Sequence, residues 1–127
     1  MEVRMNRFIG KHAYQQTALP QPKIEDAHGA ISVCLETLIN NLKVLEQKPE
    51  AGTETFNKVT SKCLTAIYIL QSSLDFEKGQ KIAESLFKLY EYVKQQIIAN
   101  SKDQEQGDLK QSIFVMTEIS ETWNSIQ

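Results

Sequence analysis

The residues best suited to chemistry lie past the middle of the chain, in the stretch SSLDFEKGQK. A calcium loop starting at Asp75 would need oxygen ligands at positions one, three and five, glycine at six and Glu at twelve. Asp75 and Glu77 fit this pattern. The other three positions hold Gly79, Gln80 and Leu86. An acid–base pair would need apolar burial to separate the two carboxyl pKa values, and a polar connection does not supply it. We therefore interpret the stretch as a turn, with Asp75 capping the next helix and Gly79 easing the bend.

Metal and thiol sites are poorly supported. Glu25 and His28 form one Glu-x-x-His pair, but a di-iron bundle needs two such pairs, and His12 has no matching Glu. Cys34 and Cys63 stand far apart among apolar neighbours, without the local pairs of a zinc site. We expect them to be buried free thiols. No metal and no cofactor is predicted.

His28 has one alternative use, because a lone histidine on a helical bundle is how histidine phosphotransfer domains carry a phosphoryl group. Those domains place a lysine and a glycine three and four residues after the histidine. Here Ile31 and Ser32 occupy these positions. A partly buried structural histidine is the favoured interpretation, and a phosphotransfer-type bundle is kept as an alternative.

The composition points to one ordinary globular domain. The chain has 127 residues and a net charge of -2, which gives no electrostatic bias toward nucleic acid. No apolar run approaches the roughly 18 residues of a membrane span. We expect a cytoplasmic protein that neither binds nucleic acid nor inserts into a membrane.

The apolar periodicity predicts the elements that must position any site. Residues 1–22 lack it, end in LPQP, and are expected to form a mobile N-terminal arm. The remainder, 23–127, is expected to be an all-α, antiparallel up-down four-helix bundle. The helices are predicted over residues 23–47, 53–74, 77–100 and 108–126.

The third predicted helix has a regular core stripe. Its members are Ile82, Leu86, Leu89, Val93 and Ile97. We assign Leu86 and Val93 to the core, where alanine at Leu86 should cost about 2–5 kcal/mol of stability.

More apolar residues are present than one small bundle needs to bury. Such a surplus on a soluble protein usually indicates a partner, and a groove for an apolar helix or extended peptide is the functional interpretation. Core packing is the alternative for each residue. The candidate groove residues are Tyr68, Ile69, Phe87, Tyr90, Phe114 and Val115.

The segment SSLDFEKGQKIAESLFKLYEYVKQQIIAN, residues 72–100, resembles the flagellar secretion chaperone family FliS, whose members bind flagellin before export. Weaker agreement comes from AYQQT near the N-terminus, from HGAI in the first helix and from Trp123 near the end. The chain departs from the family pattern at several places. Gln80 replaces a second glycine, Ser85 replaces an asparagine, and His28 replaces an aspartate.

This resemblance implies a helical export chaperone without enzymatic activity. Its implied partner is the C-terminal segment of flagellin, which is disordered when free and would be bound in apolar grooves. Binding would prevent premature polymerisation and allow delivery to the flagellar type III export apparatus. Tyr14, which matches the family's N-terminal tyrosine motif, is the candidate contact with the export gate, or else part of a strap that covers the bundle. A structural or adaptor bundle remains a further alternative.

Overall fold

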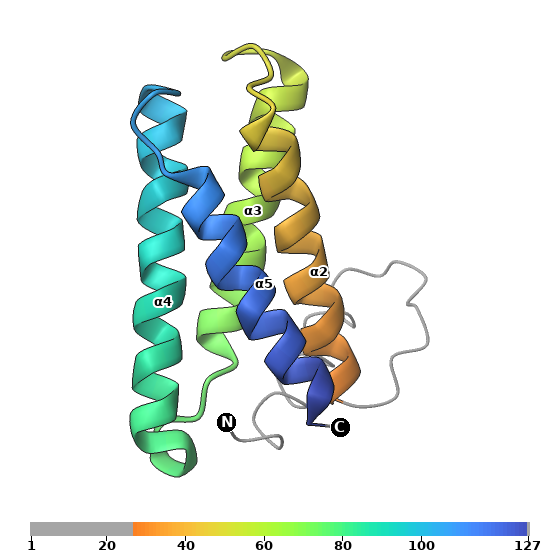
Figure 1. Ribbon diagram of the computed structural model, residues 1–127, viewed down its shortest axis with the longest axis vertical. Helices are drawn as coiled ribbons and strands as arrows, with labels where there is room; N and C mark the ends of the chain where they lie inside the picture. Colours follow the sequence, from red (N-terminus) through yellow and green to blue (C-terminus); the bar gives the residue numbers. More distant parts are fainter. Residues whose placement is uncertain (1–26, 127) are drawn as a thin grey trace.

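The computed structural model describes residues 27–126, which form four helices (Figure 1). They are α2 (Ala27–Glu46), α3 (Glu54–Ser72), α4 (Phe76–Lys102) and α5 (Leu109–Ser125). Wherever an end can be compared, these bounds differ from the predicted ones by one or two residues. The predicted arm 1–22, with Tyr14, and the predicted start of the first helix lie outside the described residues.

Short polar side chains set where three of the helices begin. The Thr53 hydroxyl accepts a hydrogen bond from the backbone N–H of Phe56 at 3.2 Å and caps α3. The carboxylate of Asp75 accepts from the backbone N–H groups of Glu77 and Lys78 at 3.0 and 3.1 Å and caps α4, as expected. Asp108 caps α5 in the same manner. Each cap pairs N–H groups that have no partner inside the helix.

The helices pack as a four-helix bundle, which confirms the predicted fold class. α2 packs against α3 and α5, and α4 packs against the same two helices, so the four surround one core. Each helix contributes one stripe of buried residues. On α2 this stripe includes four leucines with no exposed surface, Leu35, Leu38, Leu42 and Leu45.

The core stripe of α4 differs from the predicted one. Ala83, Tyr90 and Val93 are buried at spacings of seven and three, whereas Ile82 is 62% exposed and Leu89 is 38% exposed. In the first half of α4 the buried positions are therefore displaced by one residue, from Ile82 to Ala83 and from Leu89 to Tyr90, whereas the second half has the predicted Val93 and Ile97 in the core. The prediction was correct for Val93. For Leu86 it was wrong, since this side chain is only half-buried and borders the core.

The first turn of α4 is set apart from the rest by its backbone. Gln80 has φ 45° and ψ -121°, so the unusual conformation falls on Gln80 and not, as expected, on Gly79. A residue with a Cβ adopts this region only under strain of about 1–3 kcal/mol. The family pattern has its second glycine at this same position.

Replacing Gln80 with glycine should therefore stabilise the protein. The relief of strain exceeds the conformational entropy that glycine costs, and we expect the free energy of unfolding to rise by about 1 kcal/mol. Chemical denaturation followed by circular dichroism measures the change. Lys88→Gly, at an exposed and regular position of the same helix, is the control and should lower stability by about 1 kcal/mol. Equal losses in both variants would contradict strain at Gln80.

The loop between α4 and α5 lies directly against the last turns of α4. A Cβ added to Gly107 would lie 2.8 Å from Cβ of Asn100 and would overlap the backbone carbonyl oxygen of Gln96. The amide of Asp108 donates to the side chain of Gln96 at 2.9 Å beside this contact. The absence of a side chain at Gly107 thus allows the loop to approach the helix closely.

Gly107→Ala should cost about 1–3 kcal/mol of stability, since the clash involves helix backbone that cannot move aside cheaply. Gly52→Ala is the comparison variant. A Cβ added at Gly52 would have no atom within 4 Å, so only the positive φ of 85° opposes the new side chain. Thermal unfolding of both variants tests this. A Gly107→Ala protein as stable as the unsubstituted one would show that the loop can shift freely.

Candidate partner-binding groove

A hollow of about 390 Å³ lies between α4 and α5 at the end of the bundle where α4 begins and α5 ends. Its floor includes Leu35 of α2. We call it the α4–α5 groove. Its walls include Ile82 and Leu86 of α4, Ile119 and Trp123 of α5, and Ile126 directly after α5, while Tyr90 of α4 lies at its base. The volume is within the range of sites that bind ligands or peptide side chains.

The walls are almost entirely apolar because each helix carries more than one apolar stripe. Ile82, Leu86 and Leu89 follow one another at spacings of four and three and therefore share one side of α4. Ile82 and Ile126 expose 62% and 57% of their surface, which is unusual for large aliphatic side chains. Ile82, Leu86 and Ile126 line the same hollow and give it an apolar surface of the kind that marks an interaction site.

The groove is open because α5 runs obliquely across the bundle. Figure 1 shows α5 leaving the loop beside the end of α4 and crossing toward the start of α2. At its beginning α5 is close to α4, where Gly107 contacts the helix. At its end Trp123 is paired with His28 of α2. The two helices thus diverge toward the end at which Ile82 and Ile126 are exposed.

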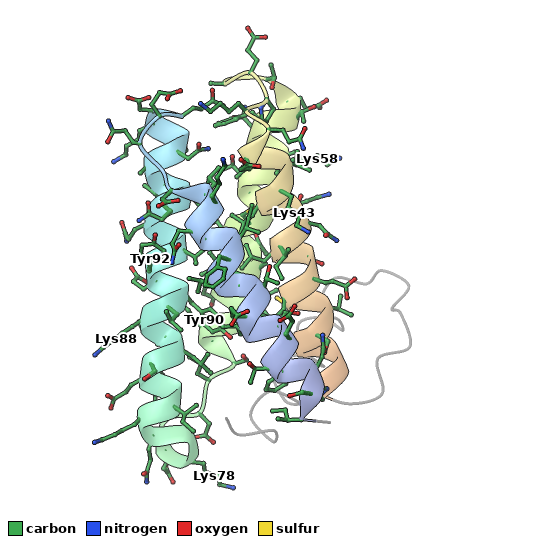
Figure 2. All side chains as sticks on the ribbon, in the orientation of Figure 1. Lys43, Lys58, Lys78, Lys88, Tyr90 and Tyr92 are labelled. Carbon is green, nitrogen blue, oxygen red and sulfur yellow. The ribbon has the colours of Figure 1, made fainter. Side chains whose placement is uncertain are left out.

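Tyr90 connects the groove to the core. It is 1% exposed and borders the hollow as part of its base. Figure 2 shows Tyr90 on the inner side of α4, whereas Lys88 projects outward from the same helix. Burial raises the pKa of its hydroxyl well above the ordinary range, and the nearby Cys34 adds to this. Tyr90 stays neutral at physiological pH and keeps the base of the groove uncharged.

The other sequence-predicted groove residues lie elsewhere on the bundle. Tyr68 on α3 and Phe114 on α5 are 71% and 59% exposed. Ile69 and Val115 are half-buried, and Val115 packs against the core. The six residues therefore do not share one hollow, and Tyr90 alone among them borders the α4–α5 groove.

Phe87 belongs to a separate apolar surface between α3 and α4. Its ring meets that of Phe76 edge-on, with 5.8 Å between centroids. The side-chain amide of Gln71 donates to the carbonyl oxygen of Phe87 at 3.4 Å and to the carboxylate of Glu91 at 3.0 Å, joining the two helices. The hydrogen bond from Gln71, together with one from the side-chain amide of Gln95 at 3.0 Å, lowers the pKa of the Glu91 carboxyl.

The structure assigns His28 a packing role. Its Nε2 lies 2.8 Å from the carbonyl oxygen of Trp123, which can only accept, so this nitrogen carries the proton. The two rings are stacked with 4.6 Å between centroids. In this hydrogen bond Nε2 has no lone pair with which to attack a phosphoryl group, so phosphotransfer through Nε2 would require the contact with Trp123 to break.

The thiols have no features of a reactive site. Cys34 and Cys63 are free, and burial raises the pKa of each to about 12, so almost no thiolate exists at neutral pH. Among residues 27–126 no group of three or more His, Cys, Asp or Glu side chains could hold a metal ion. In that same range no helix is long and apolar enough to cross a bilayer.

Comparison with known families decides the relationship. A family model described as flagellar protein FliS matches residues 10–127, nearly the whole chain. The chain belongs to the FliS family. No curated protein and no solved structure gave a significant match.

Membership of the FliS family implies the role of a flagellar export chaperone. The segment that first resembled FliS, residues 72–100, contains the α4 wall of the groove. Sequence reasoning did not select Ile82, Ile119 or Ile126 as groove residues. The sequence does contain a sign of this groove. In α4 two apolar stripes lie side by side, one with Ile82 and Leu89 and the other with Ala83 and Tyr90, and a single core can bury only one of them fully.

Proposed function

We propose that this FliS-family protein binds the disordered C-terminal segment of flagellin in the cytoplasm, prevents its premature polymerisation and delivers it to the type III export apparatus. The observation that carries the proposal is the open α4–α5 groove. Its exposed isoleucines would be covered by a partner, as expected for a surface whose function is binding.

The shape of the groove favours a helical segment as occupant. From Ile82 through Leu86 to Tyr90, the α4 residues that line the groove span a rise of about 12 Å, or roughly two turns. An amphipathic helix could place aliphatic side chains at positions i, i+4 and i+7 against this wall and the facing wall of α5. Glu118 and Thr122 border the α5 side and would face the polar edge of such a helix.

Further contacts would follow from a long client that wraps around the bundle. The exposed Tyr68 on α3, Phe87 on α4 and Phe114 on α5 are proposed as secondary contacts for its other stretches. Ile69 and Val115, which are half-buried, would support them. Tyr14 remains the proposed contact with the export gate. No catalytic step is needed for any of these roles.

Coupled folding of the client would set the strength of the complex. A disordered segment loses conformational entropy when it becomes ordered on the groove, and this loss offsets part of the favourable apolar burial. The complex could then be specific without being too tight for release at the membrane. This property suits a carrier better than a permanent subunit.

Titration calorimetry with the C-terminal segment of the flagellin from the same genome tests the proposal. We expect a one-to-one complex with a negative heat-capacity change from apolar burial. Absence of binding at micromolar concentrations would refute it. Sedimentation of the free protein distinguishes the chaperone from the adaptor alternative. An adaptor bundle that uses its apolar surface for self-association should form a dimer, so a monomer at high concentration would count against it.

A further inference from the structure

The end of α5 is fastened to the start of α2 by a reciprocal pair of residues. Nε2 of His28 donates to the carbonyl oxygen of Trp123 at 2.8 Å, and Nε1 of Trp123 donates to the carbonyl oxygen of His28 at 3.0 Å. The rings lie 10° from parallel. One turn along, Ser32 donates to Asn124 at 2.8 Å. We call His28 and Trp123 the α2–α5 clamp.

The clamp supplies a hydrogen bond to the backbone carbonyl of Trp123, which lies in the last turn of α5. The last carbonyls of a helix have no partner inside it, and that of Trp123 accepts a long hydrogen bond of 3.3 Å from the amide of Ile126. The imidazole of His28 thus caps the last turn of α5 from a neighbouring helix, in the manner of basic side chains near helix C-termini.

Trp123 belongs to the clamp and to the groove at once. It is 5% exposed, stacks on His28 and also lines the hollow beside Ile119 and Ile126. α5 could bury these isoleucines by leaning toward Ile82 and Leu86 of α4. The hydrogen bonds and the stacked rings instead hold its end on α2.

We infer that His28 is a positioning residue for the α4–α5 groove, which keeps the groove open by capping α5 and holding Trp123 against α2. The inference rests on the proposed function only in assigning partner binding to this groove. The geometric part concerns the free protein. Without the imidazole, the end of α5 is released, and apolar attraction moves Ile126 and Ile119 toward α4.

Methyl NMR of the free protein tests the geometry. In His28→Ala we expect the δ1-methyl signals of Ile82, Ile119 and Ile126 to shift, with new contacts between methyls of α4 and α5. The matched control is Thr53→Ala, which removes the cap of α3 at the far end of the bundle and lowers stability by about 1 kcal/mol. The control should leave these signals in place. Unchanged groove methyls in His28→Ala would overturn the inference.

A conservative variant separates positioning from loss of stability. His28→Gln retains an N–H donor that can reach the carbonyl of Trp123, although it loses the ring. We expect its groove methyl signals to lie between those of the unsubstituted protein and those of His28→Ala. The emission of Trp123 should follow the same order, since it is the only tryptophan of the chain. Spectra of the Gln variant identical to those of the Ala variant would contradict a role for the hydrogen bond.

Binding of the flagellin C-terminal segment completes the test. We expect roughly tenfold weaker binding by His28→Ala, the scale of one net hydrogen bond and one aromatic contact, and no comparable loss by Thr53→Ala. Equal affinities of both variants would refute positioning. If the unsubstituted protein does not bind this segment, the proposed function fails, while the methyl spectra still decide whether His28 holds the groove open.

Discussion

Replacing Ile82 with aspartate should weaken binding of the flagellin segment by about 100-fold while leaving the fold intact. Ile82 is 62% exposed, so the free protein tolerates a carboxylate there. In the complex this carboxylate would be covered by the apolar side chains of the partner and would lose its hydration. Losses of this size are typical of residues at the centre of an interface. Calorimetry measures the affinity, and circular dichroism verifies the fold.

Val33→Asp is the matched control for this experiment. Val33 is also a β-branched residue exposed on a helix, at 40%, but it lies on α2 and does not line the groove. Its variant should bind nearly as well as the unsubstituted protein. Similar affinities of both aspartate variants would mean that the partner does not use the α4–α5 groove, and attention would pass to Tyr68, Phe87 and Phe114.

Tyr90→Ala should lower the free energy of unfolding by about 3–5 kcal/mol. The ring is buried between the core and the base of the groove, and its removal leaves a cavity that the surrounding helices can fill only in part. Denaturant unfolding followed by the emission of Trp123 measures this loss. Leu86→Ala should cost less, since Leu86 is half-buried and already borders a hollow.

Tyr90→Phe is the control, because it retains the ring and removes only the hydroxyl. We expect a change of less than about 1 kcal/mol, as for other swaps that nearly conserve volume. If Tyr90→Ala lowers the free energy of unfolding by less than about 1 kcal/mol, Tyr90 is not a core residue and contributes only to the surface of the groove.

The fold was predictable because its determinants are local. Thr53, Asp75 and Asp108 are short polar residues just before apolar periodic segments, and each caps a helix in the structure. The leucine stripe of α2 has one dominant phase. Helices of comparable length joined by short connections leave few arrangements other than an antiparallel bundle.

The phase of α4 and the position of the groove were not predictable in this way. Ile82 and Leu89 form one stripe and Ala83 and Tyr90 a second, and both fit a helical period. Which stripe is buried depends on the direction of α5. That direction is fixed by His28 and Trp123, which are 95 residues apart in the sequence. Periodicity within one helix contains no information on such a contact.

The close approach of Gly107 to α4 makes the two ends of the bundle unequal in local stability. At that end the close approach of the loop at Gly107 and the hydrogen bond from the Asp108 amide to Gln96 hold α4 and the start of α5 together. At the other end the same helices diverge, and Ile82 and Ile126 are exposed. Local opening between α4 and α5 therefore requires less free energy at that end. Under the proposed function, a client helix would enter through motion confined to this end, while the opposite end would keep the helices paired during loading and release.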